Sequence, residues 1–101
     1  MNLDEIINQL DSEWGVGGFF SKVRDGIYDS KRAQEILDML RAIRVDETAP
    51  FPRRLVALLW YLPSFLGWQS ERIIEKGGDV ADYAKFSAEV QNTLEELLGV
   101  P

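Results

Sequence analysis

The sequence predicts an all-α protein, folded as a single compact bundle of five or six helices around a central apolar, proline-kinked helix. Apolar residues recur at helical spacing toward both ends of the chain. No segment shows the alternating β-branched residues and hairpin turns that are typical of strands. A chain of 101 residues has the size of one domain, so we expect residues 1–101 to form a single all-α domain.

The N-terminal third predicts two helices. Asn2 followed by Glu5 has the pattern of a capping box that begins the first helix, and Gly15 is expected to end it. The apolar stripe of this helix consists of Leu3, Ile6, Ile7, Leu10 and Trp14. We expect Asp11 and Glu13 to lie mostly off that stripe. A short helix over residues 19–25 follows, closed by Gly26.

Two longer helices are predicted farther along the chain. Asp29 or Ser30 caps a helix that is expected to continue to about Arg44. Asp79 caps the last helix, which extends to residue 98 with an apolar stripe nearly five turns long. Gly99 then occupies the position after a helix end that favours glycine.

The central element is the stretch Pro52–Trp68, in which residues 55–62 carry no charge. It is too short to span a bilayer, so we expect a buried core helix, with Trp60 inside. On that placement Trp60→Ala would destabilise the fold by about 3–5 kcal/mol. The alternative is a partner-facing or interfacial helix, because large aromatic side chains are hard to hide fully in a small domain.

Two features at the ends of this stretch need explanation. Pro63 predicts a kink or break near Leu62, or the first turn of a second helix that continues to Lys76. Arg53 and Arg54 fall in a helix first turn, where the helix dipole disfavours positive charge. They indicate a partner contact, an internal ion pair or a solvated rim paired with nearby acidic residues.

The composition restricts the functions that we consider. Seventeen acidic residues against eleven basic ones give a net charge of −6, which repels phosphate backbones and disfavours nucleic-acid binding. The same charge would attract a basic protein, or would simply keep a small domain in solution. The chain has no histidine and no cysteine, which excludes serine–histidine and cysteine–histidine nucleophiles and removes the usual zinc ligands. Paired carboxylates remain possible, but none of their spacings matches a motif with a known mechanism. We therefore expect no catalytic residue, no metal site and no cofactor, and a protein that is not an enzyme. Without a recognisable leader segment, a cytoplasmic location is expected.

The candidate partner-binding site is an acidic corner between Asp11 and Asp29. It combines negative charge with aromatic residues beside a glycine-rich turn, a combination suited to recognition. Its predicted residues are Asp11, Glu13, Trp14, Phe19, Asp25 and Asp29. The alternative is that both aromatic rings belong to the core. If the corner binds, reversing Asp11 and Glu13 to lysine should leave folding intact and slow association with a basic partner.

These observations favour a small acidic module that docks on a basic protein and regulates or inhibits it. Immunity proteins, antitoxins and phage-encoded inhibitors share this size and charge, which is an analogy of class only. The alternative is a structural homodimer or a subunit of a larger assembly that uses exposed parts of the central stretch or of the C-terminal stripe. A small-ligand site built from carboxylates ranks third. No membrane span is expected.

Overall fold

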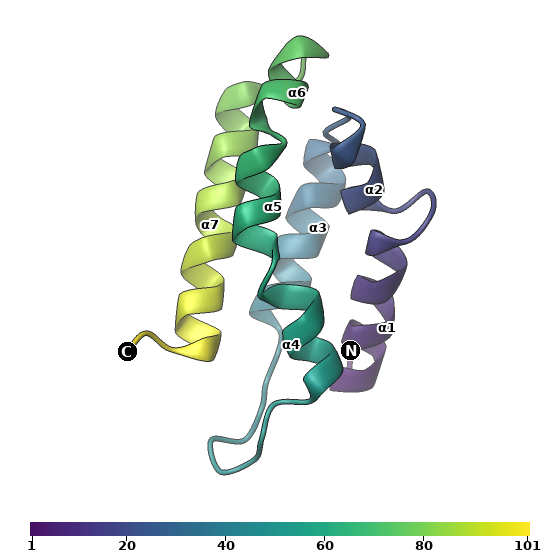
Figure 1. Cartoon of the computed structure of the whole chain (residues 1–101). Coiled ribbons are helices and arrows are strands. Elements are labelled where there is room, and N and C mark those ends of the chain that lie inside the picture. Colours follow the sequence, from purple (N-terminus) through teal and green to yellow (C-terminus); the bar gives the residue numbers. More distant parts are fainter.

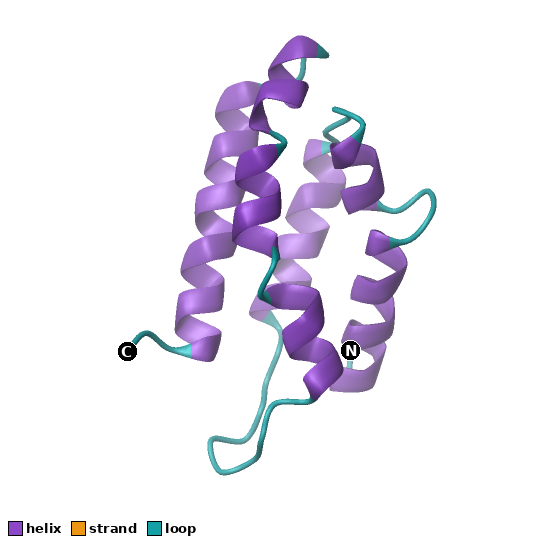
Figure 2. Cartoon of the chain, in the orientation of Figure 1, coloured by secondary structure: helices purple, strands orange, loops and turns teal.

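The computed structural model describes residues 1–101 and is all-helical, as Figures 1 and 2 show. Its helices are α1 (Leu3–Trp14), α2 (Phe19–Arg24), α3 (Ser30–Arg41), α4 (Arg53–Leu59), α5 (Leu62–Trp68), α6 (Ser70–Glu75) and α7 (Val80–Leu98). At most two residues separate α4 from α5 and α5 from α6. These three short helices therefore act as one bent strut, and with the strut counted once the bundle has five helical bodies. The predicted all-α bundle is confirmed, and the proline kink of its central helix stays a prediction.

The strut lies between two groups of helices (Figure 1). Helix α7 packs along α3 and α5 and also contacts α6, whereas α1 contacts α2 and α4. The chain termini lie at the same end of the bundle, near the long loop that joins α3 to α4. None of the seven helices has both the length and the apolar character that crossing a membrane requires.

The helix starts follow the polar residues that the sequence offers as caps. The side-chain oxygen of Asn2 accepts from the Glu5 N–H at 2.8 Å, and Asp29 and Asp79 accept in the same way at 3.1 and 3.0 Å. At the far end of α7, Gly99 has a φ of 85° and ends the helix. All three predicted caps and this predicted terminus are confirmed.

Helix α3 ends earlier than predicted, at Arg41 rather than near Arg44. The Arg44 guanidinium donates to the backbone carbonyls of Arg41 at 2.7 Å and Ile43 at 2.8 Å. These bonds satisfy carbonyls that a longer helix would have satisfied with its own backbone. The buried Ile43 thus belongs to the core without belonging to the helix.

The strut is interrupted at Trp60 and Tyr61, and Pro63 is the second residue of α5. In a helix continuing from α4, residue 63 would have to donate its N–H to the Leu59 carbonyl, and proline has none. In the first turn of a new helix the missing N–H costs nothing. The prediction that a second helix opens at Pro63 and continues to Lys76 is met in part, because α5 ends at Trp68 and α6 resumes at Ser70.

The core consists of 22 buried apolar side chains drawn from every helix. Phe65 is one of them, and its ring centroid lies 6.2 Å from that of Phe20 and 4.8 Å from that of Trp14. The placement of Trp60 in this core was wrong, because Trp60 is 64% exposed and Trp68 is 65% exposed. The strut buries one face, through Leu55, Leu58, Leu59, Leu62, Phe65 and Leu66, and presents its other face to solvent.

The turn between α1 and α2 depends on one glycine. A Cβ atom on Gly18 would lie 2.3 Å from the backbone oxygen of Glu13, well inside van der Waals contact. Gly18 is buried and its N–H donates to the Gly15 carbonyl at 3.0 Å. The glycine-rich segment is therefore explained by the close approach of α2 to the end of α1.

The buried Tyr83 makes the free energy of unfolding depend on pH in the alkaline range. Its hydroxyl donates to the Leu66 carbonyl at 2.6 Å, and burial raises its pKa from 10.0 to about 12. The folded protein keeps this proton at a pH where the unfolded chain loses it. Stability that is fully present below pH 10 should therefore fall by about 1.4 kcal/mol per pH unit up to about pH 12.

Urea denaturation between pH 9 and pH 12 measures this effect, with Tyr83→Phe as the comparison. The variant should be less stable at neutral pH, because the Leu66 carbonyl loses its donor. Its stability should also fall less steeply with rising pH. An identical slope in both proteins would contradict the assigned role of Tyr83.

Candidate functional site

Four aromatic residues form a continuous surface where α4 meets α5, hereafter the aromatic surface: Trp14, Trp60, Tyr61 and Trp68. Tyr61 is at its centre, with its ring centroid 5.5 Å from Trp60, 5.6 Å from Trp68 and 6.2 Å from Trp14. The two outer tryptophans are mostly exposed, whereas Tyr61 and Trp14 are half-buried. Exposed tryptophans clustered around a tyrosine are unusual on a monomer surface and are typical of binding sites.

The local fold explains why these side chains face outward. In α4 the leucines at positions 55, 58 and 59 take the buried face, so residues 53, 57 and 60 fall on the opposite face. The outward row continues in α5 through Ser64 and Trp68, both exposed. Between Leu55 and Gln69 the chain has no charged residue, so the outward face of the strut is uncharged over its whole middle.

The aromatic surface is held from below by the core. The Trp14 ring stacks on Phe20 at 4.6 Å, and its indole N–H donates to the Leu58 carbonyl at 3.3 Å. Tyr61 lies 6.2 Å from Phe65, a fully packed core ring. These contacts fix the inner members of the surface before any partner arrives, which lowers the entropic cost of binding.

A groove of about 330 Å³ runs beside the aromatic surface between α1 and α4. Its apolar lining consists of Trp14, Ala57, Leu58, Trp60 and Tyr61, and its charged lining consists of Asp11, Arg24 and Arg54. Arg54 forms an ion pair with Asp11. Arg24 forms no ion pair; its guanidinium lies over the Phe65 ring, 5.5 Å from the centroid.

The ion pair of Arg54 decides among the explanations offered for the two arginines that begin α4. Arg54 forms an internal ion pair with Asp11, which was one of the three explanations offered, and both side chains are more than half exposed. Arg53 is exposed and has no ion-pair partner. The unfavourable position in the helix first turn is thus offset for Arg54 alone.

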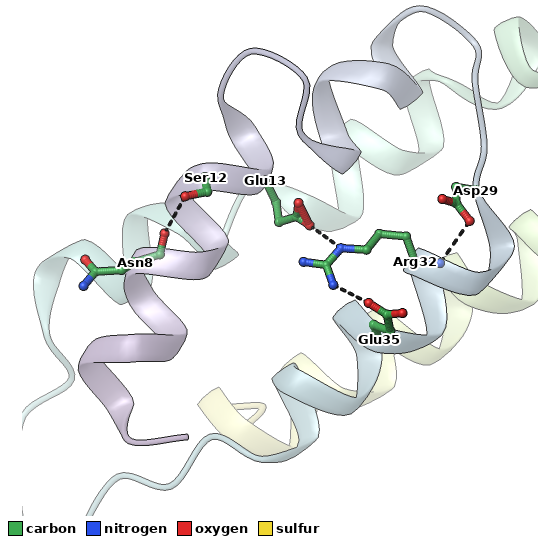
Figure 3. Close-up of polar contacts among 6 residues, drawn as sticks. All are labelled: Asn8, Ser12, Glu13, Asp29, Arg32 and Glu35. Atoms are coloured by element: carbon green, nitrogen blue, oxygen red, sulfur yellow. Dashed lines mark hydrogen bonds and ion pairs between the residues drawn. The ribbon is translucent and has the colours of Figure 1, made fainter.

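The acidic corner predicted from the sequence is divided by the structure. Glu13 is buried, and its carboxylate accepts from Arg32 Nε at 2.8 Å (Figure 3). The same guanidinium reaches Glu35 on its own helix. Burial lowers the pKa of Arg32, but the hydrogen bonds to Glu13 and Glu35 outweigh that effect and raise it overall. Glu13 was expected off the buried stripe and lies on it.

The other predicted site residues do not lie together. Phe19, like Glu13, is buried, so neither side chain can reach a partner directly in this conformation. Asp29 caps α3 and shares a cavity of about 170 Å³ with Glu13, Phe19 and the basic residues Lys22 and Arg32. Asp11 and Trp14 instead line the groove beside α4, and Asp25 is exposed without an ion-pair partner. The partner-binding role of the exposed residues stays a prediction.

One further polar contact ties distant segments together. The Tyr28 hydroxyl donates to the Asp82 carboxylate at 2.6 Å, joining the α2–α3 connection to α7. Burial and this carboxylate raise the pKa of Tyr28 far above its ordinary value. No group of three or more acidic side chains is arranged to hold a metal ion. Tyr28 and Asp82 line a cavity of only about 70 Å³, so we assign the contact a structural role in joining these segments.

Exposure of the aromatic residues in the central stretch was predicted only as the alternative to a buried helix, and Arg24 was not predicted as a site residue. The signal for Trp60 and Trp68 was their spacing of eight residues with Ser64 midway, which places all three on one helical face. Nothing in the sequence connects Arg24 to a groove whose other residues come from α1 and from positions 54–61. Comparison with protein-family models, with curated protein sequences and with solved structures found no match to this chain.

Proposed function

We propose that this protein is a protein-binding module that docks through its aromatic surface. The observation that carries the proposal is the exposure of Trp60 and Trp68 on either side of Tyr61. Burying two such indole rings against a partner would recover apolar area that folding leaves in water. Interface hot spots are enriched in tryptophan, tyrosine and arginine, and all three residue types occur here.

The net charge of −6 is the reason to expect a basic partner. On this proposal the charge acts at long range, raising the rate at which a basic protein arrives. Contact then occurs at the uncharged aromatic surface. The docked module would regulate or inhibit its partner by covering part of the partner's surface. The same net charge makes a second copy a less favourable occupant, because two copies repel each other.

The double variant Trp60→Ala/Trp68→Ala tests the proposal. Truncating one hot-spot tryptophan costs about 2 kcal/mol or more of binding free energy, so the double variant should bind its partner about a thousandfold more weakly. Affinity capture from the source organism's lysate, followed by native mass spectrometry, identifies what wild type retains. Titration of the purified partner against both proteins then gives the affinities.

A matched control removes two exposed apolar side chains elsewhere. Val16 and Ile27 are both exposed and lie in the loops on either side of α2. Val16→Ala/Ile27→Ala should bind as wild type does, and its association rate should fall with added salt as wild type's does. Equal affinities for the two double variants would refute docking through the aromatic surface. A wild-type homodimer that Trp60→Ala/Trp68→Ala converts to monomer would assign the surface to the alternative structural role.

A further inference from the structure

The groove beside the aromatic surface places one positive charge next to apolar walls. Its two arginines and one aspartate give it a local charge of opposite sign to the protein's net charge of −6. Because Arg54 already pairs with Asp11, the uncompensated charge belongs to Arg24. An occupant would therefore meet apolar side chains and one available guanidinium at the same time.

Arg24 is held in place by contacts that leave its charge unsatisfied. Its guanidinium lies over the face of Phe65, a contact that restrains it without neutralising it. Its backbone carbonyl accepts from the Arg72 guanidinium at 2.9 Å, which ties the end of α2 to α6. A guanidinium that is oriented in advance loses less entropy when it binds a carboxylate.

We infer that this groove binds a segment of the partner protein that carries an apolar side chain and a nearby carboxylate. The apolar side chain would lie against Trp60 and Tyr61, and the carboxylate would accept from Arg24. The inference rests on the proposed function and specifies the chemistry of the docking segment. A partner that is basic overall can present such a segment, because net charge governs approach whereas the groove governs contact.

Charge complementarity favours this occupant over others with negative charge. Nucleic acid and anionic membrane surfaces carry many charges and would be repelled by the net charge of −6. A mostly apolar segment with a single carboxylate has only one negative charge for the protein to repel, and that charge is stabilised by contact with Arg24. The groove volume of about 330 Å³ lies at the lower end of the range for sites that hold a few side chains or a small molecule.

A displayed library of random peptides, panned on the full-length protein, tests the inference without knowledge of the partner. Enriched peptides should carry Asp or Glu within about four residues of an aromatic or aliphatic side chain, the reach of one helical turn. For a synthetic copy of such a peptide, Arg24→Gln should weaken binding at least about tenfold, as loss of a charge-assisted hydrogen bond predicts. Trp60→Ala should weaken it as well.

Lys22→Gln is the matched control, because Lys22 is an exposed basic residue of the same helix that lies outside the groove. It removes the same charge and should leave peptide affinity unchanged. Equal losses for Arg24→Gln and Lys22→Gln, enrichment of peptides without acidic residues, or no enrichment at all would each overturn the inference. If Trp60→Ala/Trp68→Ala abolishes binding while Arg24→Gln does not, the carboxylate contact fails and docking through the aromatic surface survives. A homodimer lost in Trp60→Ala would make a second copy the occupant and overturn the inference.

Discussion

Phe65→Ala should lower the free energy of unfolding by about 3–5 kcal/mol, whereas Trp60→Ala should lower it by less than about 1 kcal/mol. Phe65 is 2% exposed and its ring contacts both Phe20 and Trp14, so its removal leaves a cavity in the core. Trp60 has Tyr61 as its only aromatic neighbour and is mostly in water. The larger side chain is thus expected to have the smaller effect.

Urea denaturation followed by far-ultraviolet circular dichroism measures both values, since helix content reports on the whole bundle. Trp68→Ala serves as a second exposed variant and should match Trp60→Ala, because the two indoles are equally exposed. A loss of several kcal/mol in Trp60→Ala would mean that the indole is buried in solution. That result would remove the aromatic surface and the function proposed for it.

Helix positions were predictable because capping residues and apolar stripes report local geometry. Asn2, Asp29 and Asp79 each accept from the N–H three residues on, and this contact depends on nothing outside its own helix start. The end of α3 was predicted less well. There the Arg44 side chain, and not the backbone of a longer helix, donates to the carbonyls of Arg41 and Ile43. A hydrogen bond from a side chain leaves no periodic pattern in the sequence that would mark the end of the helix.

The exposed face of the strut was hard to predict for a different physical reason. Polar residues normally mark the outward face of a helix, and the strut has no charge between Leu55 and Gln69. With apolar residues all round, burial had to be decided by tertiary packing.

The candidate site shows the same limit. Asp11 and Glu13 were grouped because both are acidic and close in the sequence. Residues two positions apart on a helix, however, differ by about 200° of rotation and point in nearly opposite directions. Glu13 is seven residues from Ile6 and three from Leu10, both fully buried, and this spacing indicated an inward position. Its partner Arg32 is 19 residues away, so the ion pair itself was beyond the reach of local pattern.

Reversing the charge of Glu13 and of Asp11 in separate variants should show which of the two carboxylates the fold depends on. Glu13→Lys should destabilise the fold by about 3 kcal/mol, because it removes a buried carboxylate and sets a second cation against Arg32. Asp11→Lys should cost less than about 1 kcal/mol, because Asp11 and Arg54 are both more than half exposed. We therefore keep the prediction that folding stays intact for Asp11→Lys alone.

Thermal and urea denaturation of the two single variants, at the same ionic strength, tests this division. Glu13→Gln is the conservative comparison: its amide oxygen still accepts from Arg32 Nε, so it should fall between wild type and Glu13→Lys. Equal stability of Asp11→Lys and Glu13→Lys would mean that the Glu13 pair opens to water, and would return Glu13 to the candidate binding surface. If Glu13→Lys alone is destabilised, slower association in a doubly reversed protein would be uninterpretable, and Asp11→Lys becomes the variant with which to test electrostatic steering by this corner.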